Sequence, residues 1–312
     1  MNSFWVALRV VAPMALLMGI GVLVRKARIV EPDTMRQMDK LTFRLFMPTL
    51  LFSNIYRANL AEQFSAKLVG FAAIGLMAIF ALALLLPSRL EPDHNRAASI
   101  GQAMIRSNYI LFGVAVAESL YGDGQAATVA LLGTLVVPLS NALAVVILEI
   151  NRSGKANPGK IVLAIFKNPM VIAALLAVTL QLLHLRLPGI AETVVDDLAG
   201  VTTTLSFISL GVSLNLGEMQ RNRRPLAVGI LLRMLLVPLI FLPITLLLGF
   251  HGQEFCALLV LFAAPAAVAS YPMAVAMGAD GPLSGQLVVF TTIISIFTMF
   301  AFTFLFDAMG IL

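Results

Sequence analysis

Ala264-Pro265-Ala266-Ala267-Val268-Ala269-Ser270-Tyr271-Pro272 lies inside the run 255–279, which contains no charged residue. A run of this length exceeds the ~20 apolar residues that a helix needs to cross a bilayer. Each of the two prolines removes a backbone donor and leaves a carbonyl without its helical partner. The stretch therefore predicts a membrane-crossing helix that is interrupted near its middle, with a simple kink as the alternative.

The composition of the whole chain is that of an integral membrane protein. Of its 312 residues, 60% are apolar and 12% are charged, and the mean hydropathy is +0.96. Soluble domains are about 45–50% apolar and about 25% charged, so an ordinary globular enzyme, a disordered chain and a coiled coil are excluded. The net charge of +5 is too small to indicate nucleic-acid binding, and the single cysteine excludes an intrachain disulfide.

Ten apolar runs predict ten transmembrane helices. The runs are continuous and not alternating, which favours helices over a β-barrel and an all-α fold. Five runs are clear: 68–88, 124–148, 198–217, 255–279 and 281–306. Five carry a charge at an edge or inside: Phe4–Val24, Leu41–Tyr56, Ala97–Leu120, Ile161–Leu183 and Leu226–Leu248.

The distribution of lysine and arginine predicts the orientation. Counting along ten spans, the odd-numbered loops hold 14 of these residues and the even-numbered loops hold 3. Loops rich in lysine and arginine stay in the cytoplasm. We therefore expect a multi-pass protein of the cytoplasmic (inner) membrane with both termini outside the cytoplasm.

The two halves of the chain resemble each other. Pro87 and Pro243 are 156 residues apart, and the pairs Asp123-Gly124 and Asp280-Gly281 are 157 apart. Because five spans is an odd number, the second half must insert upside down relative to the first, as in inverted-repeat transporters. This pattern predicts repeats over 1–152 and 161–312, joined by a cytoplasmic linker over 153–160.

Inverted-repeat transporters bind substrate near the midplane, where broken helices meet. The fourth span carries Arg106-Ser107-Asn108-Tyr109-Ile110-Leu111-Phe112-Gly113, which matches the interrupted ninth span. We predict that the two spans cross at Gly113, Pro265 and Pro272. The predicted substrate-binding residues are Arg106, Ser107, Asn108, Tyr109, Ser270 and Tyr271.

Arg106 is the strongest of these candidates. A charge at membrane depth costs about 2.5–3.5 kcal/mol on insertion scales, so such residues are usually functional. Its guanidinium fork suits a carboxylate, and the alternative is that it caps carbonyls freed by the broken helix. Arg44 is expected to snorkel, and Arg233 to snorkel or form a salt bridge. Asn54, Asn141 and Asn215 are expected to form interhelical hydrogen bonds.

Acidic residues are expected only in loops or at span ends. The closest approaches to a span are Glu118, Glu149, Asp280 and Asp307. A carboxylate proton relay at the midplane is therefore not expected, and coupling to sodium, to protons or to neither stays open.

Several motifs in order resemble the auxin efflux carrier family, whose bacterial members include transporters of malonate and other dicarboxylates. The resemblance rests on 41–52 (LTFRLFMPTLLF), 106–113, Lys-Asn-Pro at 167–169, Leu-Gly-Val-Ser-Leu at 210–214 and the Pro265 stretch. It implies two inverted five-helix repeats with broken, crossing fourth and ninth helices. Spans 1, 2, 6 and 7 would form a scaffold, and spans 3–5 and 8–10 a moving transport unit. The short link between spans five and six implies that the regulatory loop of plant members is missing.

The predicted function is a secondary transporter that moves a small organic anion, a carboxylate, by alternating access. A channel or a membrane sensor on the same scaffold is the alternative, and a membrane-embedded enzyme is a third. No motif for a catalytic nucleophile, a metal site or ATP hydrolysis is present, so we expect no enzyme activity, no metal and no cofactor. The expected partners are the anion and the lipid bilayer, with no nucleic acid, and a homodimer is left open.

Overall fold

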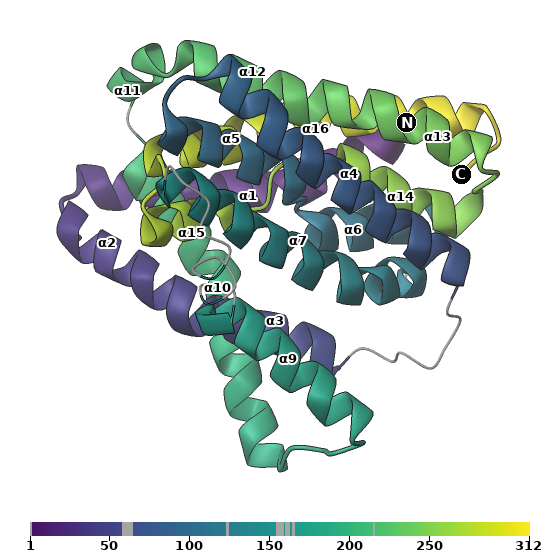
Figure 1. The fold of residues 1–312 in the computed structure, drawn as a ribbon, viewed down its shortest axis with the longest axis horizontal. Coiled ribbons are helices and arrows are strands. Elements are labelled where there is room, and N and C mark those ends of the chain that lie inside the picture. The colour runs from purple at the N-terminus through teal and green to yellow at the C-terminus, as the bar shows by residue number, and fades with distance from the viewer. Residues whose placement is uncertain are drawn as a thin grey trace.

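The chain forms helices throughout the residues that the structure, a computed structural model, describes: 2–57, 65–122, 125–153, 159, 163, 166–214 and 216–312 (Figure 1). Within these ranges the only β contact is one isolated bridge. The predicted all-α class is confirmed. Most of the predicted linker over 153–160, together with Asp123 and Asn215, lies outside the described residues.

The helices follow one another in two halves. The first half contains α1 (Asn2–Lys26), α2 (Pro32–Leu41), the π-helical turn η1 (Thr42–Phe46), α3 (Met47–Tyr56), α4 (Ala66–Leu90), α5 (His94–Ile105), α6 (Tyr109–Tyr121) and α7 (Ala127–Ser153). The second contains α9 (Pro169–Leu182), α10 (Gly189–Ser213), α11 (Leu216–Arg221), α12 (Arg223–Leu231), the π-helical turn η2 (Leu232–Leu236), α13 (Val237–Leu247), α14 (Gly252–Ala263), α15 (Ser270–Met277) and α16 (Gly281–Ala308).

Five helical segments in the described part of the chain are long and apolar enough to cross a membrane. They are α4, α7 as far as Ile150, α10, the segment Arg223–Leu247 and α16. α6, α9 and α14 are apolar but shorter. The predicted second span differs from the structure, because its helix begins at Pro32 and not near Leu41. Glu31 is extended and proline is favourable in a first helical turn, so the predicted Glu31-Pro32-Asp33 loop is where this helix starts.

The helices gather in two groups. α3 packs against α9 and α10, and these three lie together in the lower part of Figure 1. α1 runs along α10, and their backbones touch: a Cβ at Gly211 would lie 2.1 Å from the Met18 carbonyl oxygen. The helices α4, α5, α7, α12, α14 and α16 pack among themselves as the second group.

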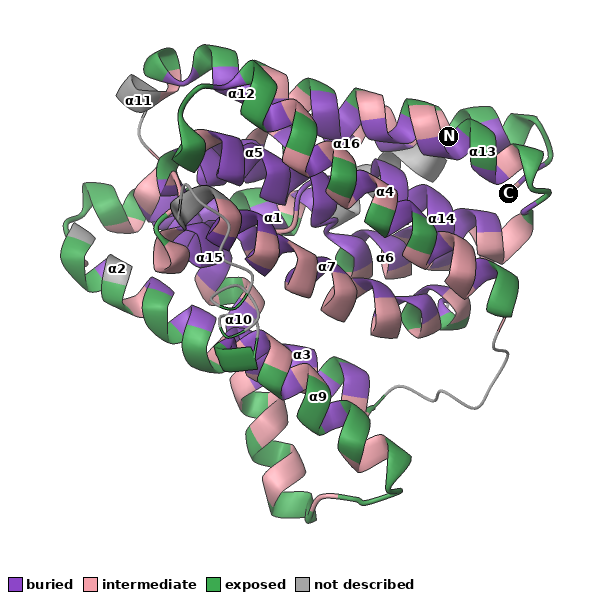
Figure 2. Cartoon of the chain, in the orientation of Figure 1, coloured by how far each residue is buried: buried purple, intermediate pink, exposed green. Residues whose placement is uncertain are grey.

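Burial differs strongly between the helices. Every residue of α14 from Phe255 to Ala263 is buried, whereas α9 exposes Leu175 and Leu182 and α1 exposes Leu16 and Leu23 (Figure 2). Leucines exposed on several helices are costly in water and favourable in lipid. The outer surface therefore fits a protein that is embedded in a bilayer.

Candidate functional site

Two helices are broken at matching places, and the breaks meet. One break separates α5 from α6 at residues 106–108, and the other separates α14 from α15 at residues 264–269. The Asn108 backbone N–H donates to the Pro265 carbonyl at 2.9 Å, and the Ala267 N–H donates to the Arg106 carbonyl at 2.9 Å. Ser107 and Ala266 form an isolated antiparallel bridge between the two extended segments. The interruption in the ninth span is thus an unwound crossing, and the simple kink is wrong.

Arg233 holds the carboxyl ends of the two half-helices α5 and α14. Its side chain is fully buried and donates to the carbonyls of Met104 at 2.9 Å, Leu261 at 3.2 Å and Ala264 at 2.6 and 2.9 Å. These carbonyls lack helical partners because the helices end there. The positive guanidinium lies at the negative ends of both helix dipoles, which is a favourable electrostatic interaction.

The expectation that Arg233 snorkels or forms a salt bridge is therefore wrong. The position of a residue within a predicted span gives its distance from the membrane surface. It does not give the face of the helix on which the side chain lies. Arg44, in contrast, is exposed on the η1 turn. The capping role that was the alternative for Arg106 belongs to Arg233.

Arg106 is a buried cation without an anionic partner. Its side chain is 4% exposed, and its hydrogen bond is to the Met273 sulfur, at 3.3 Å from Nη1. A thioether is a weak acceptor, and among the described residues no carboxylate lies within salt-bridge distance of this guanidinium. Most of its hydrogen-bonding capacity is therefore unused.

A cavity of about 180 Å³ lies beside the crossing, between it and the group of α3, α9 and α10. Four of the predicted binding residues line it, namely Arg106, Ser107, Asn108 and Tyr109. Five polar residues from neighbouring helices also line it: Asn54, Ser140, Asn141, Thr202 and Thr203. Asn54 and Asn141 were expected to form interhelical hydrogen bonds, and their position in the cavity lining was not predicted. The only indication of it in the sequence is that they are polar residues within apolar spans.

Two residues that line the cavity carry buried polar groups without a hydrogen-bond partner. The Asn108 amide nitrogen and the Tyr109 hydroxyl are buried, and neither has a hydrogen-bond partner. α6 begins at Tyr109 without a side-chain cap, and its first residues line the cavity. A helix N-terminus is a favourable place for an anion. A guanidinium, an amide and a helix N-terminus at one cavity form an arrangement that can hold a carboxylate.

Ser107 lines the cavity, but its hydroxyl donates to the Val260 carbonyl at 3.2 Å. The other predicted residues do not line the cavity. Ser270 is buried with an unpartnered hydroxyl, and Tyr271 is bonded to Ser213; neither lines the cavity. A Cβ at Gly113 would lie 2.4 Å from the Val129 side chain.

The role of Gly113 is therefore to let α6 approach α7, and Gly113 does not belong to the crossing itself. Pro265 accepts the hydrogen bond from Asn108 at the crossing, and Pro272 lies in the first turn of α15.

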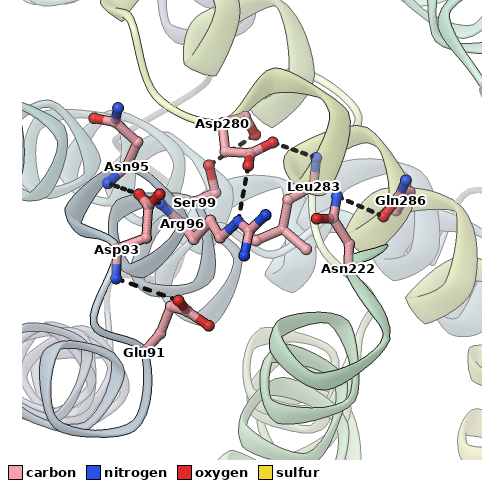
Figure 3. Close-up of polar contacts among 9 residues, drawn as sticks. All are labelled: Glu91, Asp93, Asn95, Arg96, Ser99, Asn222, Asp280, Leu283 and Gln286. Atoms are coloured by element: carbon pink, nitrogen blue, oxygen red, sulfur yellow. Dashed lines mark hydrogen bonds and ion pairs between the residues drawn. The ribbon is translucent and has the colours of Figure 1, made fainter. Parts of the chain in front are cut away.

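Asp280, one of the acidic residues predicted at a span end, has a structural role (Figure 3). Its carboxylate caps α16 by accepting from the Leu283 N–H at 2.9 Å and pairs with Arg96 at 3.4 Å. Its carbonyl accepts from the Ser99 hydroxyl at 2.9 Å. These contacts tie the start of α5 to the start of α16.

The expectation that acidic residues lie only in loops or at the named span ends overlooked Asp39. Asp39 is 1% exposed and lies in α2, because this helix starts nine residues before the predicted span.

Comparison with known proteins agrees with this architecture. The family model described as "Membrane transport protein" matches residues 6–303. The chain is also similar to an uncharacterized transporter of Methanothermobacter thermautotrophicus, with 22% identity over 283 residues, which is 90% of this chain and 92% of that protein. The chain therefore belongs to the membrane transport protein family, the auxin efflux carrier family that its sequence motifs resemble.

Proposed function

We propose that this protein is a secondary transporter that moves a small organic anion, a mono- or dicarboxylate, across the cytoplasmic membrane by alternating access. The observation that carries the proposal is Arg106, a buried guanidinium that lines a cavity and has no carboxylate partner in the described part of the chain. A buried charge without a partner costs several kcal/mol. A substrate carboxylate at this place would remove that cost and use the Asn108 amide as well.

The size of the cavity supports a small substrate. Pockets for drug-sized ligands have volumes of about 300–1,000 Å³, and this cavity has about 180 Å³. Charge is supplied by one arginine, while Asn54, Asn141 and Thr202 add neutral polar groups from other helices. Such a set recognises one carboxylate strongly and leaves neutral hydrogen bonds for the rest of the molecule.

The proposed architecture has ten spans in two inverted repeats, over 1–152 and 161–312. Its support is the pair of matched breaks, at 106–108 and 264–269, each in the fourth helix of its half. The scaffold would be α1, the continuous segment α2–η1–α3, α9 and α10, and the transport unit the remaining spans. The cavity lies where these two groups meet, which is where relative motion would alternate access.

The cavity continues toward the end of α3. A second cavity of about 230 Å³ shares Leu51, Asn54, Ile110 and Val137 with the first and reaches Arg57 at the end of α3. In the proposed topology Arg57 and both termini lie outside the cytoplasm. The structure would then represent an outward-facing state. A carrier alternates between states that are open to one side, whereas an open channel needs a continuous path.

The test is a thermal-shift screen of the purified protein with malonate, succinate and acetate, and with malonamide as a neutral control. A ligand that binds only the folded state raises the melting temperature. We expect stabilisation by a carboxylate, none by malonamide, and loss of the effect in Arg106→Gln. Saturable exchange of the same anion in proteoliposomes then separates a carrier from a channel, a sensor or an enzyme. If none of the three anions raised the melting temperature, the proposal would be contradicted.

A further inference from the structure

Asp39 is a buried carboxylate at the place where α2 meets α10 and α15. In the proposed architecture α2 and α10 belong to the scaffold and α15 to the transport unit. Asp39 therefore lies at the moving interface, 18 residues before Arg57 along a nearly continuous helix. At 1.5 Å per residue the two are about 27 Å apart, so Asp39 is at the opposite end of the interface from the cavity opening.

The contacts of Asp39 are hydroxyl groups. The Ser209 hydroxyl of α10 donates to Asp39 Oδ1. The Tyr271 hydroxyl of α15 lies beside the carboxylate and is hydrogen-bonded to Ser213 of α10. Asp39 Oδ2 has no partner. The Tyr271–Ser213 contact joins the transport unit to the scaffold at this end of the interface, and we call the state that contains it closed.

No charged side chain compensates Asp39 from the described parts of the elements packed against it. α10 carries its acidic residues at the far end, where Glu192 and Asp196 bind Tyr56 and Arg57. α15 contributes only the titratable Tyr271, and the η1 turn carries the exposed Arg44. On α2 itself Asp33 and Lys40 are exposed.

Opening of this end would change the environment of Asp39. Separation of α15 from α2 and α10 breaks the Tyr271–Ser213 contact and admits water to the carboxylate. In the closed state the ionised form is desolvated, has no cation beside it among the described side chains and has one oxygen without a donor, so protonation removes a large cost. In the open state water stabilises the ionised form.

From this geometry we propose that Asp39, with Ser209 and Tyr271, forms a proton-binding site that controls opening of the pathway on the α2 side. This inference rests on the proposed transport function. The sign follows from linkage: the closed state binds the proton more tightly, so lower pH favours closure and opening releases the proton. The released proton leaves on the side that the topology assigns to the cytoplasm.

The test measures the distance between spin labels at Gln37→Cys on α2 and Arg224→Cys on α12, in a Cys256→Ala background in lipid nanodiscs. Both labelled positions are exposed. Distances are recorded from about pH 4 to pH 9, a range that covers ordinary and buried carboxylates. We expect the longer, open distance to gain population as pH rises, by at most tenfold per pH unit for one linked proton. No substrate is present.

Three variants make the test specific. Asp39→Asn, which imitates the protonated form, should keep the short distance at every pH. Asp280→Asn, which removes a carboxylate from the same side of the membrane, should keep the wild-type response. Ser209→Ala keeps Asp39 but removes a donor to its ionised form, so the midpoint should move to higher pH. This third variant serves if Asp39→Asn does not fold.

Distances that do not change with pH in the wild type would overturn the inference. A response that persists unchanged in Asp39→Asn, or an unmoved midpoint in Ser209→Ala, would do the same. Malonate binding, followed by thermal shift in the wild type and in Asp39→Asn, separates this result from the fate of the proposed function. Because the proposed anion site lies at Arg106, distances in the wild type that do not change with pH, together with malonate binding, would contradict only the role of Asp39 and would leave the proposed function intact.

Discussion

Removal of the Arg233 guanidinium tests how the two broken helices are held together. Arg233→Met keeps an unbranched apolar side chain but leaves three carbonyls, those of Met104, Leu261 and Ala264, without their donor. A buried polar group without a partner costs about 1–3 kcal/mol. Even if water and local rearrangement limit each loss to the lower value, the free energy of unfolding should fall by about 3 kcal/mol.

The assay is the melting temperature of the purified protein in one detergent. With an unfolding entropy of about 2.1 cal/mol/K per residue, a loss of about 3 kcal/mol in a chain of 312 residues lowers the melting temperature by about 4–5 °C, which is the shift we expect for Arg233→Met. Arg44→Met is the matched control, because Arg44 also lies in a π-helical turn but is exposed. Its effect should stay within about 0.5 kcal/mol. Equal melting temperatures for the two variants would refute the capping role of Arg233.

Three further outcomes follow from the structure. Asn108→Ala should weaken binding of the stabilising anion by roughly ten- to a hundredfold, because it removes a hydrogen bond to a charged ligand that contributes about 1.5–3 kcal/mol. Equilibrium dialysis measures this affinity, and an unchanged value would contradict the placement of Asn108 in the anion site. Asp280→Asn should lower the melting temperature slightly through loss of the ion pair with Arg96, with the α16 cap and the anion affinity unchanged. Weaker anion binding in a folded variant would place a carboxylate in the site. A cysteine at position 312 should react with an impermeant maleimide in intact cells, whereas one at position 155 should not; labelling at 155 would reverse the orientation.

The broken helices can be predicted from the sequence because proline acts locally. Pro265 removes a backbone donor whatever surrounds it, and the break between α14 and α15 falls at this proline, whereas Pro272 lies in the first turn of α15. The all-helical class follows equally from the length of the apolar runs. Arg106 and Asn108 can be chosen as candidate site residues because polar groups are rare in such runs.

The partners of the buried charged residues cannot be predicted in this way. Arg233 and Arg106 look alike in sequence, since each is an isolated arginine within an apolar run. Only the packing of four helices shows that one meets carbonyls and the other a cavity. Asp39 is missed because a charged, amphipathic helical end is indistinguishable from a loop when only hydropathy is considered.

The contributions of helices distant in sequence are also invisible beforehand. Thr202 lines the same cavity as Asn108 because α10 packs beside the crossing, not because of any spacing in the chain. Tyr271, one residue after Ser270 and close to the crossing in sequence, lies instead against Ser213 at the Asp39 end.

The measurement that tests the central claim most directly is the affinity of the stabilising anion for wild-type, Arg106→Lys and Arg106→Gln proteins, by isothermal titration of samples with matched folding. Lysine keeps the charge but loses the two-pronged guanidinium, and glutamine loses both. A charged hydrogen bond contributes about 1.5–3 kcal/mol, so we expect at least about tenfold weaker binding in Arg106→Lys and a larger loss in Arg106→Gln. Wild-type affinity in both folded variants would contradict the claim that Arg106 binds the transported anion.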